Sequence, residues 1–192
     1  YHVWVDDQVP YMVYGNRQDG WSYRGPSNSR TGSIPLGLWQ TVGGCESGWG
    51  IPDPVDPNIV WNGCYDGGLE IYDERTRQSR NVRVWPEASY GWAPADLKYR
   101  WHWTFPIHIS PHDHNRVYVG SQFIHVTEDQ GQSWDIISPD LTLNLKDHQQ
   151  SSVGVAIDNL MTFDGAVLFA IWHYLNRRQF NKSESKYNAL IR

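Results

Sequence analysis

The sequence predicts an all-β protein, and three observations point to that class. Short runs rich in β-branched and aromatic residues recur along the chain, such as NIVWNG at 58–63 and RVYVG at 116–120. Gly or Pro separates these runs about every ten residues, and long helical periodicity is absent before residue 165. Eleven Trp and eleven Tyr residues suit pleated, half-buried surfaces. We therefore expect many short antiparallel strands.

An internal repeat predicts how these strands are grouped. The segments PVDPNIVWNG (54–63) and PHDHNRVYVG (111–120) carry Pro, Asp, Asn, Val and Gly at matching positions. A second strand and a polar hairpin follow each copy. A repeated unit of this kind is a four-stranded propeller blade. Residues 1–171 are therefore predicted to form a partial β-propeller of about three to four blades.

The segment VTEDQGQSW predicts a structural hairpin. Its residues fit the Asp-box (BNR) pattern Ser/Thr-x-Asp-x-Gly-x-Thr/Ser-Trp through Thr127, Asp129, Gly131, Ser133 and Trp134. We expect the Asp129 carboxylate to accept backbone N–H groups, Gly131 to supply a positive φ, and Trp134 to pack between sheets. This motif is therefore architectural, and Asp129→Ala should weaken the fold without changing ligand binding per folded molecule.

Longer stretches resemble a known family. They include VDDQVPYMVYGNRQDGWSYRGPS, VGGCESGWGIPDPVDPNIVW, GGLEIYDERTRQSRNV and TFPIHISPHDHNRVYVGS with the Asp box after it. These stretches resemble the large BNR-repeat proteins grouped with glycosyl hydrolases, which are similar to the sortilin ectodomain and to xyloglucanase-type propellers. The resemblance covers roughly residues 1–171. It implies a propeller that acts on, or binds, a small or carbohydrate ligand in its channel.

Residues 172–192 depart from the repeat pattern. Five Arg or Lys and one Glu fall in 173–192, whereas the whole chain has a net charge of −5. Leu168, Ile171, Trp172 and Leu175 recur at helical spacing. We expect a short basic, helical tail. A partial ring leaves sheet edges and one apolar face open, so a homo-oligomer, most simply a dimer, is expected.

Charge and hydropathy exclude two classes of partner. A net charge of −5 argues against a nucleic-acid groove, and no apolar run reaches the length of a membrane span. The chain begins at Tyr1 within what reads as a strand, so any export signal is expected outside this segment. Cys45 and Cys64 are equally compatible with a disulfide and with two buried thiols.

Two glycine-flanked polar runs, YGNRQDGWSYRG and GGCESGWG, supply the candidate catalytic residues. We expect them on inner strands that face a channel. Asp19 and Glu46 are the candidate carboxylate pair for glycoside hydrolysis, one as acid and one as base or nucleophile. Together with Asn16 they also offer the oxygen ligands that Ca²⁺ prefers. The alternative is that Asp19 caps a turn and pairs with Arg17 or Arg24.

Further polar and aromatic residues are candidates for ligand binding. Arg17, Gln18 and Arg24 belong to the first polar run. The segment YRWHWTF (99–105) alternates as a strand would, which places Arg100 and His102 on its polar face. Trp92 lies in a long aromatic loop that suits sugar stacking.

The histidine-rich segment HISPHDH resembles a metal motif, but the repeat argues against one. Its Asp113 and Asn115 align with Asp56 and Asn58, which have no histidine nearby. A turn is therefore the favoured interpretation.

Three functions remain open from the sequence. The first is a glycosidase-like hydrolase that uses Asp19 and Glu46. The second is a hydrolase of a small ester or lactone with a channel-bound Ca²⁺. The third is a non-catalytic module that binds a peptide or glycan. No Ser-His or Cys-His motif at nucleophile-elbow spacing supports covalent Ser or Cys hydrolysis.

Overall fold

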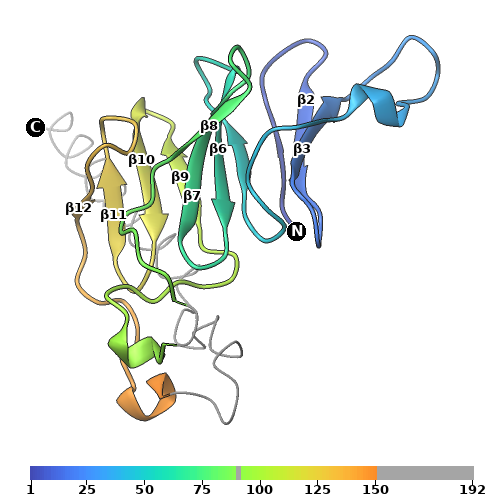
Figure 1. Ribbon diagram of the computed structural model, residues 1–192. Coiled ribbons are helices and arrows are strands. Elements are labelled where there is room, and N and C mark those ends of the chain that lie inside the picture. The colour runs from blue at the N-terminus through green and yellow to red at the C-terminus, as the bar shows by residue number, and fades with distance from the viewer. Residues whose placement is uncertain (90–91, 151–192) are drawn as a thin grey trace, which may run out of the picture.

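The computed structural model describes residues 1–89 and 92–150, and it is all-β, as predicted (Figure 1). The described strands form three four-stranded antiparallel sheets. Helix within these residues is limited to three short 3-10 turns, η1 (Leu36–Leu38), η2 (Pro94–Asp96) and η3 (Lys146–Gln149). The predicted tail at 172–192 and the domain boundary at 171 lie outside the described residues.

Each sheet is a meander in which strands pair in chain order. The first sheet contains β1 (Val3–Val5), β2 (Met12–Asn16), β3 (Ser22–Pro26) and β4 (Gln40–Thr41). The second contains β5 (Gly50–Pro52), β6 (Ile59–Cys64), β7 (Gly68–Asp73) and β8 (Gln78–Asn81). The third contains β9 (Ile107–Ser110), β10 (Asp113–Gly120), β11 (Ile124–Thr127) and β12 (Asp135–Ile136).

The second sheet lies between the other two, and its side chains alternate between them (Figure 1). Val60 pairs with Tyr72, and both pack toward the first sheet. Trp61 pairs with Ile71, and both pack toward the third. Because consecutive strand residues point to opposite faces, neighbouring residues of β6 and of β7 pack against the first and the third sheet in turn.

The interior of the boundary between the second and third sheets is apolar. Eleven buried residues form one cluster there: Ile51, Trp61, Leu69, Ile71, Val82, Tyr99, Trp101, Phe105, Ile107, Val117 and Val119. The rings of Trp101 and Phe105 lie 5.0 Å apart in an edge-to-face contact. The Trp101 ring also packs against the backbone of Gly67, which adopts φ 65°. A Cβ at this position would lie 2.5 Å from the ring, so only glycine fits there.

The boundary between the first and second sheets is built differently. Its apolar part is a small cluster of Tyr14, Val42, Val60 and Tyr72. Beside it, Asn16 Nδ2 donates to Ser22 Oγ at 2.6 Å, and Asn62 Nδ2 donates to the Val42 carbonyl at 2.5 Å. The Asn16 bond lies within the first sheet, whereas the Asn62 bond crosses the boundary, so a buried hydrogen bond helps to join the two sheets.

The sequence repeat corresponds to the same turn in two sheets. Asp56 Oδ1 accepts from the Asn58 backbone N–H at 3.2 Å and from its side-chain amide at 2.9 Å. Asp113 Oδ1 accepts from the equivalent groups of Asn115 at 3.1 and 3.2 Å. An Asx side chain that bonds two residues ahead closes a turn in both copies.

The expected strand at 99–105 was wrong. This segment is irregular and precedes β9. Tyr99 and Trp101 are held by the apolar cluster, and the Thr104 backbone N–H donates to His102 Nδ1 at 3.2 Å. The alternating aromatics anchor a folded connection, and that pattern looks like a strand when only the sequence is known.

Connections in an antiparallel meander alternate between two ends of the sheet. We call the end with the β2–β3, β6–β7 and β10–β11 connections and the links between sheets the hairpin end. We call the other end, where β1, β5 and β9 finish, the turn end. The two ends carry different side chains and define two candidate sites.

Candidate functional site

Three of the predicted residues meet at the hairpin end. Glu46 Oε2 accepts from Gln18 Nε2 at 2.6 Å and from the Asp19 backbone N–H at 2.8 Å. Asp19 lies in the β2–β3 hairpin and Glu46 in the β4–β5 link, so their expected placement on inner strands was wrong. Glycine-flanked polar runs are equally typical of hairpins and links, which explains the error.

A disulfide fixes the position of this cluster. Cys45 and Cys64, left open by the sequence, are bonded, with their Cα atoms 5.2 Å apart. Glu46 directly follows Cys45, and Tyr65 directly follows Cys64. Asn16 Nδ2 also donates to the Cys45 carbonyl at 2.6 Å. The Glu46 link is therefore held both to the end of β6 and to the end of β2.

An aromatic strip continues from the same cluster. The Tyr1 hydroxyl donates to Gln18 Oε1, and Trp103 Nε1 donates to the Tyr1 hydroxyl at 3.1 Å. Trp103 in turn stacks on Tyr65, with ring centroids 4.8 Å apart and planes 12° from parallel. Tyr1 is 52% exposed, so the strip faces solvent.

We call Tyr1, Gln18, Asp19, Glu46, Tyr65 and Trp103 together the hairpin-end surface. Elements adjoining all three sheets contribute to it. Tyr1, Tyr65 and Trp103 were not predicted from the sequence, because none of them belongs to a polar run. The disulfide pairing, had it been known, would have pointed to Tyr65 through its neighbour Cys64.

The other predicted residues of the first sheet have structural partners. Asn16 is buried at 8% exposure, and its Oδ1 has no hydrogen-bond partner among the residues that the structure describes. The Arg17 guanidinium lies 5.6 Å from the centroid of the Tyr23 ring. Arg24 forms an ion pair with Glu74 at 3.0 Å. Arg24 thus joins the first sheet to the second.

Arg100, His102 and Trp92 do not share one environment. Arg100 is 5% exposed, and its Nη2 donates to Thr142 Oγ1 at 2.7 Å and to Asp140 Oδ2 at 3.2 Å. His102 accepts the local bond from Thr104, whereas Trp92 is 56% exposed. Arg100 therefore forms a buried ion pair that ties two connections of the third sheet together.

The Asp-box residues form a closed set of hydrogen bonds. Asp129 Oδ1 accepts from the backbone N–H groups of Gln132 and Ser133, each at 2.9 Å. The Ser133 hydroxyl donates to Asp129 Oδ2 at 2.6 Å, and Gly131 adopts φ 76°. Bonds from Ser133 and from the Thr127 hydroxyl lower the pKa of Asp129 to about 2. The hairpin is stabilised by these bonds at the turn end.

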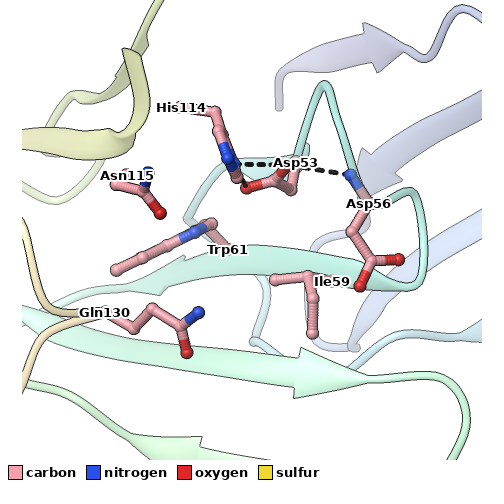
Figure 2. Close-up of a pocket in the computed structure, with 7 residues that line it drawn as sticks. All are labelled: Asp53, Asp56, Ile59, Trp61, His114, Asn115 and Gln130. Carbon is pink, nitrogen blue, oxygen red and sulfur yellow. Dashed lines mark hydrogen bonds and ion pairs between the residues drawn. The ribbon is translucent and has the colours of Figure 1, made fainter.

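A small pocket of about 140 Å³ lies at the turn end between the second and third sheets. Figure 2 shows Asp53 and Asp56 facing residues of the third sheet across it. His114 Nδ1 lies 3.0 Å from Asp53 Oδ2, which pairs the two sheets. Asn115 and Gln130 complete the rim around Trp61 (Figure 2).

Asp53 also lines a larger cleft of about 440 Å³ where β1, β5 and β9 end. None of the predicted catalytic, ligand-binding or metal-binding residues is among the described residues that line either cavity. The sequence repeat could have pointed to Asp53 as a turn residue, because Asp53 aligns with Ser110. Asp53 Oδ1 accepts from the Val55 N–H at 2.8 Å, and Ser110 Oγ accepts from the His112 N–H at 3.2 Å.

The histidines of the third sheet are not arranged around a metal. Within residues 1–89 and 92–150, no group of three or more His, Cys, Asp or Glu side chains could hold an ion. His125 is buried beside aromatic rings, and burial, with a smaller contribution from Lys98, lowers its pKa to about 4. In the same described ranges, the helices are all too short or too polar to cross a membrane.

No family model, curated protein or solved structure matches this chain. The BNR resemblance, the Ca²⁺ site at Asn16, Asp19 and Glu46, and the homo-oligomer therefore remain predictions. The hairpin end and the turn end of the sheets are the two candidate sites.

Proposed function

We propose that the three sheets are blades of an Asp-box β-propeller and that the hairpin-end surface binds a carbohydrate. Three consecutive meanders with the same strand order support the propeller assignment. The turn shared by 56–58 and 113–115 and the hydrogen bonds of the Asp box support it further. The basis of the proposal is this regularity within the chain.

One observation carries the assignment to carbohydrate. An unbroken chain of contacts runs from Tyr65 through Trp103, Tyr1 and Gln18 to Glu46. Aromatic faces stack on the C–H faces of a sugar ring, while carboxylate and amide groups bond its hydroxyls. These groups already orient one another, and the disulfide restrains the links that carry them. Binding should therefore cost little conformational entropy.

Calorimetric titration with a panel of neutral and acidic oligosaccharides tests the assignment. We expect Trp103→Ala to weaken binding about tenfold, since stacking on one aromatic ring contributes on the order of 1 kcal/mol beyond area burial. Trp92→Ala is the matched control, because Trp92 is exposed and lies outside the surface. Near-UV circular dichroism checks that both variants are folded. Equal affinities for both variants and the parent would refute the surface assignment.

Hydrolysis is the second candidate, because Asp19 and Glu46 are adjacent. The 2.8 Å contact between the Asp19 N–H and Glu46 Oε2 brings two acidic residues to one surface. If they act as acid and base, Asp19→Asn abolishes turnover of aryl-glycosides and retains binding. Turnover of esters or lactones that EDTA removes would instead indicate the Ca²⁺-dependent mechanism.

A further inference from the structure

We propose that the cleft at the turn end binds an organic cation whose charged group is carried on a short apolar stem. The cleft of about 440 Å³ lies where β1, β5 and β9 end. Trp4 and Asp7 reach it from the first sheet, Asp53 from the second and His108 from the third. This site lies at the opposite end from the hairpin-end surface and does not depend on it.

The apolar wall of the cleft is rigid. Pro52, Pro54, Pro57 and Pro111 line it together with Ile109. Proline fixes one backbone dihedral, so a wall built from it holds its shape in the absence of a ligand. An aliphatic stem can lie against such a wall at a low entropic cost.

The polar rim of the cleft is acidic. Asp6 is buried, and its carboxylate accepts from the Met12 N–H at 2.8 Å and from the Tyr14 hydroxyl at 3.0 Å. Asp7, next in the chain, is exposed and lines the cleft as well. Asp53 carries the third carboxylate, which is paired with His114.

No basic side chain among the described lining residues offsets this charge. Arg and Lys are absent from the lining. Desolvation lowers the pKa of His108, which favours the neutral form of its imidazole. Hydrogen bonds from Gln8, Met12 and Tyr14 satisfy the buried Asp6 carboxylate. Asp7 is thus the exposed negative charge of the cleft, which should favour cations over anions.

The Trp4 ring favours a cation over a neutral polar ligand. It is 38% exposed and lines the cleft, as Asp7 does. The face of an indole ring attracts ammonium and guanidinium groups. A carboxylate and an indole together therefore select a positive charge, while the proline wall accommodates the stem.

Titration of the full chain with N-butylguanidine, a guanidinium on a butyl chain, tests the proposal. N-butylurea is the neutral analogue of similar shape. We expect butylguanidine to bind and butylurea to bind at least about threefold more weakly, with the butylguanidine affinity falling as salt is raised. Asp7→Asn should weaken butylguanidine binding by about three- to fivefold, which is the effect expected for an exposed charge pair.

Asp135→Asn is the control variant, because Asp135 is an exposed carboxylate on β12, outside the cleft. It should leave the butylguanidine affinity unchanged. Equal binding of butylguanidine and butylurea would overturn the proposal, as would an Asp7→Asn variant with the parent's affinity. Absence of any saturable butylguanidine binding at millimolar concentration and low salt would overturn it equally.

Discussion

The two boundaries of the second sheet differ in what holds them together. Toward the third sheet, eleven buried apolar residues form one continuous cluster. Toward the first sheet, only four buried apolar residues cluster, and polar contacts such as the Arg24–Glu74 ion pair fill the rest. Apolar burial is non-directional, whereas hydrogen bonds and ion pairs require one geometry. The boundary with the first sheet therefore requires a more specific geometry, and apolar burial stabilises it less than it stabilises the boundary with the third sheet.

The polar boundary also carries an energetic cost. Asn16 Oδ1 and Asn62 Oδ1 are buried there without hydrogen-bond partners in the described part of the chain. An unsatisfied buried acceptor costs on the order of 1 kcal/mol or more. The Cys45–Cys64 disulfide lies at this boundary and offsets such a cost by restricting the unfolded chain. The hairpin-end surface adjoins this boundary, so its geometry depends on the disulfide more than on the apolar core.

The largest expected effect is at the apolar boundary. Phe105 is 1% exposed and contacts Trp101, so Phe105→Ala should lower the free energy of unfolding by about 3–5 kcal/mol through lost burial and the cavity left behind. Urea denaturation followed by Trp fluorescence measures this. Trp92→Ala, at an exposed position, should change it by less than about 0.5 kcal/mol. Similar values for both variants would mean that this cluster does not drive the fold.

A somewhat smaller effect is expected at the polar boundary. Cys45 and Cys64 are separated by 19 residues, and a loop of that size predicts a loss of about 3 kcal/mol when both are replaced by Ala. Reducing agent should lower the unfolding midpoint of the parent and leave that of the double variant unchanged. A parent whose midpoint resists complete reduction, verified by thiol titration, would show that the boundary is held without the disulfide.

The same contrast explains what the sequence could predict. Apolar periodicity and the repeat gave the all-β class and the equivalence of β6 and β10, because both depend on local patterns. Asp19 and Glu46 were assigned to strands, whereas they lie in a hairpin and a link, since composition does not separate a polar hairpin from a polar strand. The cleft was missed because its residues come from three strand ends that are far apart in the chain, and only the packing of the sheets brings Asp7, Asp53 and His108 together.

The smallest expected effect concerns the rim of the apolar boundary, where the Asp box meets β8. Trp134 Nε1 donates to the Val82 carbonyl at 3.0 Å, and a Cβ at Gly131 would lie 2.6 Å from Val82 Cβ. The Asp129 carboxylate holds the hairpin that presents both residues. Asp129→Ala should therefore lower the melting temperature at pH 7 by less than Phe105→Ala or the double cysteine variant does, because the carboxylate is exposed and its bonds compete with water.

The pKa of Asp129 predicts how this effect depends on pH. The pKa is about 2 in the folded protein, against an ordinary value of 3.8, because Ser133 and Thr127 donate to the ionised form. A carboxylate with a lowered folded pKa contributes its full stability above pH 4 and loses it as the pH falls toward 2. The difference in melting temperature between the parent and Asp129→Ala should thus be constant from pH 7 to 5 and shrink toward pH 2. Asp135→Ala, which removes an exposed carboxylate, should show no such convergence. A difference that persists undiminished at pH 2 would show that the side chain acts through packing and not through its charge.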